Sequence, residues 1–221
     1  MNFYNKKGIK YYTDLRTELI NLVPNNPKNW ILEIGAGAGQ NLVYLKESGK
    51  AENVVGIDIM EIRDSHQQSP LIDSFFVCDI ERTPIKLVPA SFDILLCGDI
   101  LEHLNDPWGT LRHLNSFLKS SALLILSIPN FREIKNLYTI IVKGDFNYQP
   151  SGILDKTHLR FFCKKNIIQL VKSSGFEILE ISPRFLKINE FSKKKFFNRI
   201  TLGIFKDFLA TQYIVVARKE L

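Results

Sequence analysis

The chain has 221 residues, of which 45% are hydrophobic and 24% charged, and its formal net charge is +6 at pH 7. This length and composition predict a single globular domain over residues 1–221 and require no second one. The longest apolar runs are far shorter than the roughly 20 residues that span a bilayer, and the first residues hold no apolar signal-peptide core, so we expect a cytoplasmic protein.

The distribution of charge argues against nucleic-acid binding, and the cysteines argue against a disulfide-rich or zinc-binding protein. Much of the basic excess lies from Lys193 onward, and no basic stripe runs through the motifs described below, which argues against a nucleic-acid-binding module. Cys78, Cys97 and Cys163 are an odd set without CxxC spacing. They predict neither a disulfide framework nor a zinc site, and we expect no bound metal.

Apolar runs of strand length alternate with helical patterns along the chain, which is typical of βαβ units around a parallel sheet. A helical cap is expected over residues 1–28, ahead of the first strand. The expected strands lie near residues 30–34, 53–58, 74–78, 92–97, 122–128, 176–182 and 211–218.

The first strand leads into a glycine-rich loop, ILEIGAGAGQ. Its spacing is GxGxG; the dinucleotide fingerprint GxGxxG fails because Gln40 occupies the third glycine position when the motif starts at Gly35. Glu33, just before the loop, would repel a pyrophosphate and attract an ammonium group. The loop therefore predicts a ligand that is cationic at this end.

The second strand, VVGID, ends in an acid, Asp58. A carboxylate at this position can accept hydrogen bonds from both hydroxyls of a ribose. Taken with Glu33, it predicts a ligand that has a ribose and an amino group and carries no phosphate.

Two helices have readable ends. In NDPWGTLRHLNSFL, Asp106 is the expected N-cap, Pro107 is the first helical residue, and leucines continue at helical spacing as far as Leu118. In KKNIIQLVKSSGF, the apolar residues share one face, and Gly175 stands where a C-terminal cap belongs. Both helices are expected to pack on the sheet.

Residues 186–208 form a basic amphipathic segment inserted between the last two strands. One helical face holds its aromatic and aliphatic residues, and most of its lysines and arginines lie off that face. The favoured interpretation is a lid over a substrate pocket. The alternative is peripheral contact with an anionic membrane through residues 193–208.

In this order and spacing, the motifs resemble the class I S-adenosylmethionine-dependent methyltransferases of the small bacterial type. The resemblance covers most of the chain, in ILEIGAGAG, GID, VCDIE, FDILLCGDILEHL, SIPN and GILDKTHLRFFCKKNIIQLVKSSGFEI. It implies an α/β fold, a Rossmann-like doubly wound sheet of seven strands that is mostly parallel with a C-terminal antiparallel hairpin. It also implies S-adenosylmethionine as the cofactor.

The family pattern assigns roles within this site. The loop glycines let the backbone approach the cofactor, Glu33 supports its amino group and Asp58 holds its ribose. Asp79 would accept the adenine amino group, although a helix N-cap is the commoner use of such an Asp. The residues expected to bind the cofactor are Glu33, Gly35, Ala36, Gly37, Gln40, Asp58, Ile59, Asp79, Ile80, Gly98 and Asp99.

Two histidines are the candidates for catalysis. A sulfonium methyl group is already activated, so a base is needed only when the acceptor arrives protonated. His158 is the expected base, with Asp155 to orient it and Arg160 to hold an anionic substrate group; a purely structural role is the alternative. His103 is the second candidate, and for it a packed histidine that fixes its loop is favoured. Asn130 is a further expected substrate contact.

The methyl acceptor is only loosely determined. The run from SIPN to GILDKTHLRFF is similar to methyltransferases of glycan and surface-polysaccharide biosynthesis, which favours a sugar or glycan precursor. It is also similar to quinone-pathway O-methyltransferases, which makes a small aromatic or lipid-like molecule the alternative. A nucleic-acid-binding module that retains the fold is a third interpretation. The sequence does not predict the oligomeric state.

Overall fold

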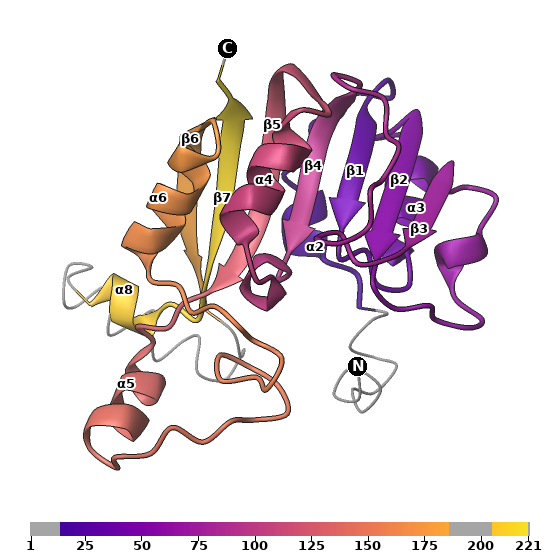
Figure 1. Ribbon diagram of the computed structural model, residues 1–221. Helices are drawn as coiled ribbons and strands as arrows, with labels where there is room; N and C mark the ends of the chain where they lie inside the picture. The colour runs from indigo at the N-terminus through magenta and orange to yellow at the C-terminus, as the bar shows by residue number, and fades with distance from the viewer. Residues whose placement is uncertain (1–13, 186–204, 221) are drawn as a thin grey trace.

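Residues 14–185 and 205–220, which this computed structural model describes, form one sheet of seven strands in the order β3-β2-β1-β4-β5-β7-β6 (Figure 1). β1 to β5 pair in parallel, and β7 lies antiparallel between β5 and β6. The expected fold is confirmed. The strands are β1 (Trp30–Ile34), β2 (Asn53–Asp58), β3 (Ser74–Val77), β4 (Phe92–Gly98), β5 (Leu118–Pro129), β6 (Phe176–Arg184) and β7 (Gln212–Lys219).

Helices cover both faces of this sheet. Figure 1 shows α4 and α6 in front of the sheet and α3 behind it. Ile31 and Leu32 of β1 show why both faces are covered: they point to opposite sides, and each packs into a different core cluster. The helices are α2 (Thr17–Ile20), α3 (Gln40–Glu47), η2 (His66–Gln68), η3 (Leu101–His103), α4 (Pro107–Asn115), α5 (Ile134–Ile141), α6 (Lys164–Ser173) and α8 (Lys206–Leu209), where η marks a 3-10 helix.

The predicted helix ends on the front face are confirmed. Asp106 caps α4, because its Oδ1 atom accepts a hydrogen bond from the Gly109 N–H at 2.9 Å, and Pro107 is the first helical residue. α6 ends just before Gly175, whose φ of +83° is the left-handed conformation that favours glycine at a helix end.

The expected continuation of α4 to Leu118 is wrong. The helix ends at Asn115, and Leu118 is the first residue of β5. Leu118 pairs with Phe92 of β4, and the carbonyl of Phe117 accepts hydrogen bonds from the backbone N–H groups of Ser91 and Phe92. Pairing with β4 therefore ends the helix about one turn before the position that the leucine spacing suggests, and the chain enters the sheet there.

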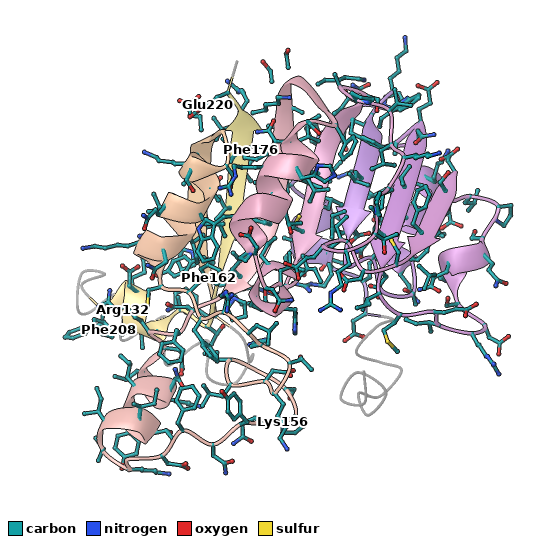
Figure 2. All side chains as sticks on the ribbon, in the orientation of Figure 1. Arg132, Lys156, Phe162, Phe176, Phe208 and Glu220 are labelled. Atoms are coloured by element: carbon teal, nitrogen blue, oxygen red, sulfur yellow. The ribbon has the colours of Figure 1, made fainter. Side chains whose placement is uncertain are left out.

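Two expected segments are described only in part. Residues 1–13 of the N-terminal cap and residues 186–204 of the amphipathic segment lie outside the described residues. The helical cap and the amphipathic helix therefore stay predictions. After residue 204, α8 packs near the loop that follows β5, where the Arg132 guanidinium carbon lies 4.4 Å from the centre of the Phe208 ring (Figure 2). No helix among the described residues is long and apolar enough to cross a membrane.

Candidate functional site

A cavity of about 330 Å³ lies at the carboxyl ends of β1 to β4. Loops that leave parallel strands meet at this edge, which is where open α/β sheets bind ligands. All the residues expected to bind a cofactor line it, with the exception of Gln40, which begins α3. The lining also contains residues that sequence reasoning missed, among them Asp14, Arg16, Asn41, Met60, Cys78, Glu81 and Ile100.

The glycine loop is held against the end of β2 by Asp58. One carboxylate oxygen of Asp58 accepts a hydrogen bond from the Gly37 N–H at 2.7 Å, and the other accepts one from the Met60 N–H at 2.8 Å. Gly35 has a φ of +72°, and a Cβ atom there would lie 3.0 Å from the Ile100 side chain. This loop therefore needs glycine for its conformation and to leave room for the neighbouring side chain.

Glu33 is a buried acid at the wall of the cavity, with 2% of its surface exposed. Its Oε1 atom accepts a hydrogen bond from the Asn41 side chain at 2.6 Å, whereas Oε2 has no hydrogen-bond partner among the described residues. Burial raises the pKa of Glu33 to about 7, although the Asn41 hydrogen bond and the charge of Arg16 oppose the shift. An unpaired buried acceptor of this kind favours a ligand with a charged donor.

Arg16 places a guanidinium in the same cavity. It donates hydrogen bonds to the carboxylate of Asp99 at 2.8 Å and to the hydroxyl of Ser127 at 2.9 Å. Asp99 also accepts hydrogen bonds from the Gln212 side chain at 2.7 and 2.6 Å, so β7 contributes to the site from the other side of β5. No sequence motif contains Arg16, and only the folded chain brings it to the ends of β4 and β5.

Asp79, Ile59 and Ile80 also line the cavity. The Asp79 Oδ1 atom accepts a hydrogen bond from the Glu81 N–H at 2.9 Å, and Asp79 forms an ion pair with Arg82 at 3.5 Å. Asp79 thus stabilises its own turn and lines the cavity, so the structural and ligand-binding interpretations of this residue are compatible.

Three of the expected substrate contacts do not line the cavity. The buried side chain of Asn130 donates hydrogen bonds to the carbonyls of Asp207 and Ala210, at 2.7 and 2.8 Å. Asp155 accepts two hydrogen bonds from Thr157. The Arg160 guanidinium donates to the carbonyls of Asn105 and Leu159. These hydrogen bonds tie together the loops in which the three residues lie.

The two histidines lie side by side, and only His103 lines the cavity. Their ring centres are 4.7 Å apart with the rings edge to face. His158 is buried behind His103, and its Nε2 atom lies 3.8 Å from Glu102 Oε1. The loop before α6 thus places the imidazole of His103, and not that of His158, at the wall of the cavity, and the expected role of His158 as a base stays a prediction.

A family model described as "Methyltransferase domain" matches residues 4–181. The chain is 27% identical over 158 residues to a ubiquinone biosynthesis O-methyltransferase of Coxiella burnetii, a match that covers 69% of this chain and 65% of that protein. It is 30% identical over 125 residues to the mitochondrial enzyme of that name from Saccharomyces cerevisiae, covering 54% of this chain and 39% of that protein. The chain thus spans less than two thirds of either relative.

Solved structures share the fold. A SAM-dependent methyltransferase from Archaeoglobus fulgidus has a TM-score of 0.64 at 19% identity, and the match covers 92% of each chain. The 1,6-didemethyltoxoflavin-N1-methyltransferase of Burkholderia thailandensis, solved with bound 1,6-didemethyltoxoflavin and S-adenosylhomocysteine, has a TM-score of 0.59 at 14% identity, covering 99% of this chain and 81% of that one.

Proposed function

The chain belongs to the methyltransferase-domain family, and from this premise we propose that it transfers a methyl group from S-adenosylmethionine to a hydroxyl oxygen of a small aromatic acceptor. The expected cofactor, S-adenosylmethionine, is confirmed by the family and its structural neighbours. The observation that carries the proposal is the unpaired carboxylate oxygen of Glu33 in a cavity whose wall also holds a guanidinium.

The charged groups of the cavity fit this cofactor. The amino acid end of S-adenosylmethionine has an ammonium group, which Glu33 Oε2 can accept, and a carboxylate, which Arg16 can attract. Asp58, whose oxygens already accept two backbone hydrogen bonds, has further lone pairs for the ribose hydroxyls. When bound, the cofactor supplies a methyl group on a positively charged sulfur.

The names of the curated relatives support an aromatic acceptor over the sugar or glycan precursor that the sequence favours. Both named relatives are ubiquinone biosynthesis O-methyltransferases. The lining next to His103 includes Ile100 and Leu104, which can exclude water from the point of transfer. Exclusion of water and alignment of the two reactants supply much of the catalysis in a displacement of this kind.

A phenolic hydroxyl, with a pKa near 10 in water, must lose its proton during transfer. The Nδ1 atom of His103 lies 3.0 Å from the carbonyl oxygen of Thr157. A carbonyl only accepts, so Nδ1 carries the proton and Nε2 has a lone pair. We therefore assign proton removal to His103 rather than to His158, which does not line the cavity.

A transfer assay with labelled S-adenosylmethionine tests the acceptor class. Phenols and catechols should be methylated, and nucleotide sugars should not, because a sugar hydroxyl is a weaker acid. In calorimetry with S-adenosylmethionine, Asp58→Ala should weaken cofactor binding by about 1.5–3 kcal/mol through loss of charge-assisted hydrogen bonds. Asp145→Ala, which changes an exposed acid outside the cavity lining, is the matched control. Methylation of sugars without methylation of phenols would overturn the aromatic proposal.

A further inference from the structure

We propose that Glu102, His103 and His158 bind a divalent transition-metal cation at the wall of the cavity. Each residue offers one ligand atom, and these atoms all lie within 4.8 Å of one another. The cysteines gave no sign of such a site, and the sequence predicts no metal. The three residues come together only in the folded chain, where His158 of the loop before α6 lies next to Glu102 and His103 of η3.

The protonation states of both histidines suit a metal. Nδ1 of His103 lies 3.0 Å from the carbonyl oxygen of Thr157, and Nδ1 of His158 lies 3.0 Å from that of Ile153. Because a carbonyl only accepts, each Nδ1 atom carries a proton, and in the neutral form of either ring the lone pair that can bind a cation is on Nε2. Metal-binding histidines commonly donate their second ring N–H to a backbone carbonyl in this way, which fixes the tautomer and the ring orientation.

Backbone hydrogen bonds hold the two segments of this cluster together. The carbonyl oxygen of Glu102 accepts hydrogen bonds from the N–H groups of Leu159 and Arg160, at 2.8 and 3.0 Å. These bonds join η3 directly to the residues that follow His158. The ligand atoms are thus brought together by the main chain, before any side chain binds a cation.

Distances and burial agree with this assignment. Nε2 of His158 lies 3.8 Å from Glu102 Oε1, and tetrahedral metal–ligand bonds of about 2.0–2.2 Å place ligand atoms roughly 3.4 Å apart. Small side-chain movements suffice to reach that separation. Glu102 is 1% exposed and His158 is 8% exposed. A cation would offset the cost of burying a carboxylate in this position.

The donor set selects the type of cation. Two imidazole nitrogens and one carboxylate suit zinc, iron or cobalt in the divalent state, whereas magnesium and calcium prefer oxygen ligands. Three protein ligands also leave coordination positions for a further ligand. What the cation does there rests on the proposed function: with Nε2 of His103 as a metal ligand, the cation would replace that imidazole in deprotonation by coordinating the acceptor oxygen and lowering the pKa of its hydroxyl, so that the proton passes to water. Whether it binds does not depend on that function.

Zinc titration of the chelator-treated full chain, followed by calorimetry, tests the site directly. We expect one Zn²⁺ per chain, bound more weakly as the pH falls through the imidazole range because protons compete for Nε2. Glu102→Gln and His103→Gln should each weaken binding roughly 100-fold or more, because loss of a ligand exceeds the 10- to 100-fold cost of losing an outer partner. His66→Gln and His113→Gln, which change the two exposed histidines, are the matched controls.

Circular dichroism and Co²⁺ spectra distinguish loss of a metal ligand from loss of the fold. His103 is only half-buried, so His103→Gln should keep the circular dichroism spectrum and the cofactor affinity of the wild type. Co²⁺ bound to the wild type should give visible ligand-field bands without a thiolate charge-transfer band. The absence of Zn²⁺ binding, or equal binding by wild type and His103→Gln, would overturn the proposal. Either result leaves the methyl-transfer assay untouched, so failure of the metal site and failure of the proposed function are distinguishable.

Discussion

Glu33 is a buried acid whose state of ionisation should depend on whether a ligand is bound. Its pKa is raised to about 7 because burial disfavours the carboxylate, so a large part of the population is protonated below neutrality in the absence of ligand. In the proposed complex, the ammonium group of the cofactor would stabilise the ionised form. Binding therefore lowers this pKa and releases a proton when the pH is below about 7.

The expected outcome is a cofactor affinity that falls as the pH drops below about 7, approaching tenfold per unit, and that is constant above it. Calorimetry between pH 5.5 and pH 8 measures this. Glu33→Gln keeps the size of the side chain and an acceptor for Asn41, and it should bind more weakly with little pH dependence. A wild-type affinity that does not change over this range would mean that the ammonium group is held elsewhere.

At the scale of residues, the sequence predicts those parts of the site that belong to a continuous motif. Glu33 and Asp58, which both line the cavity, could be singled out because Glu33 is the last residue but one of β1, just before the glycine loop, and Asp58 is the last residue of β2. Arg16 and Asn41 could not, since each is defined by a partner distant in the chain: Arg16 by Asp99 and Asn41 by Glu33. That His103 rather than His158 lines the cavity was also unpredictable, because it depends on how the loop before α6 folds.

At the scale of elements, the capping of α4 is open to a direct test. Asp106→Ala removes the hydrogen bond to the Gly109 N–H and should lower the free energy of unfolding by about 1 kcal/mol. Urea unfolding measures the change, and Asp106→Asn, which retains the acceptor, should restore most of the stability. Equal loss in both variants would show that the charge matters rather than the cap.

The boundaries of elements were predictable where a chemical signal marks them. Asp106 with Pro107 marks the start of α4, and Gly175 marks the end of α6. The junction between α4 and β5 has no such signal. Leucine spacing continues through it, and the decisive interactions are long-range, including the ion pair of Lys119 with Asp93 at 2.8 Å. A local pattern cannot contain that information.

At the scale of the whole molecule, the cofactor cavity joins loops from four strands with residues of the N-terminal segment. A ligand that binds only the folded state adds about 2.7 kcal/mol at 100 times its dissociation constant. For a chain of this size, this should raise the melting temperature by about 5–10 °C. A thermal-shift experiment with S-adenosylmethionine or S-adenosylhomocysteine measures it, and NAD is the control. An equal shift with NAD would contradict the assigned cofactor.

The overall topology was predictable because strand and helix patterns alternate over most of the chain. The stretch between β5 and α6 was not, because its order depends on tertiary contacts. Asn130 fixes the carbonyls of α8, and Glu102 joins the loop before α6 to η3. Neither contact can be recognised from the residues that neighbour it in the sequence.

The position of β7 has a consequence for the order of events during synthesis. β6 leaves the ribosome before β7, yet within the described residues it pairs only with β7, which pairs in turn with β5. Until residues 212–219 emerge, the edge of β5 is uncovered and β6 has no place in the sheet. The nascent chain thus carries an open strand edge from the completion of β5 at residue 129 until β7 emerges, and this is the stage at which a chaperone that covers such edges would protect it from mispairing.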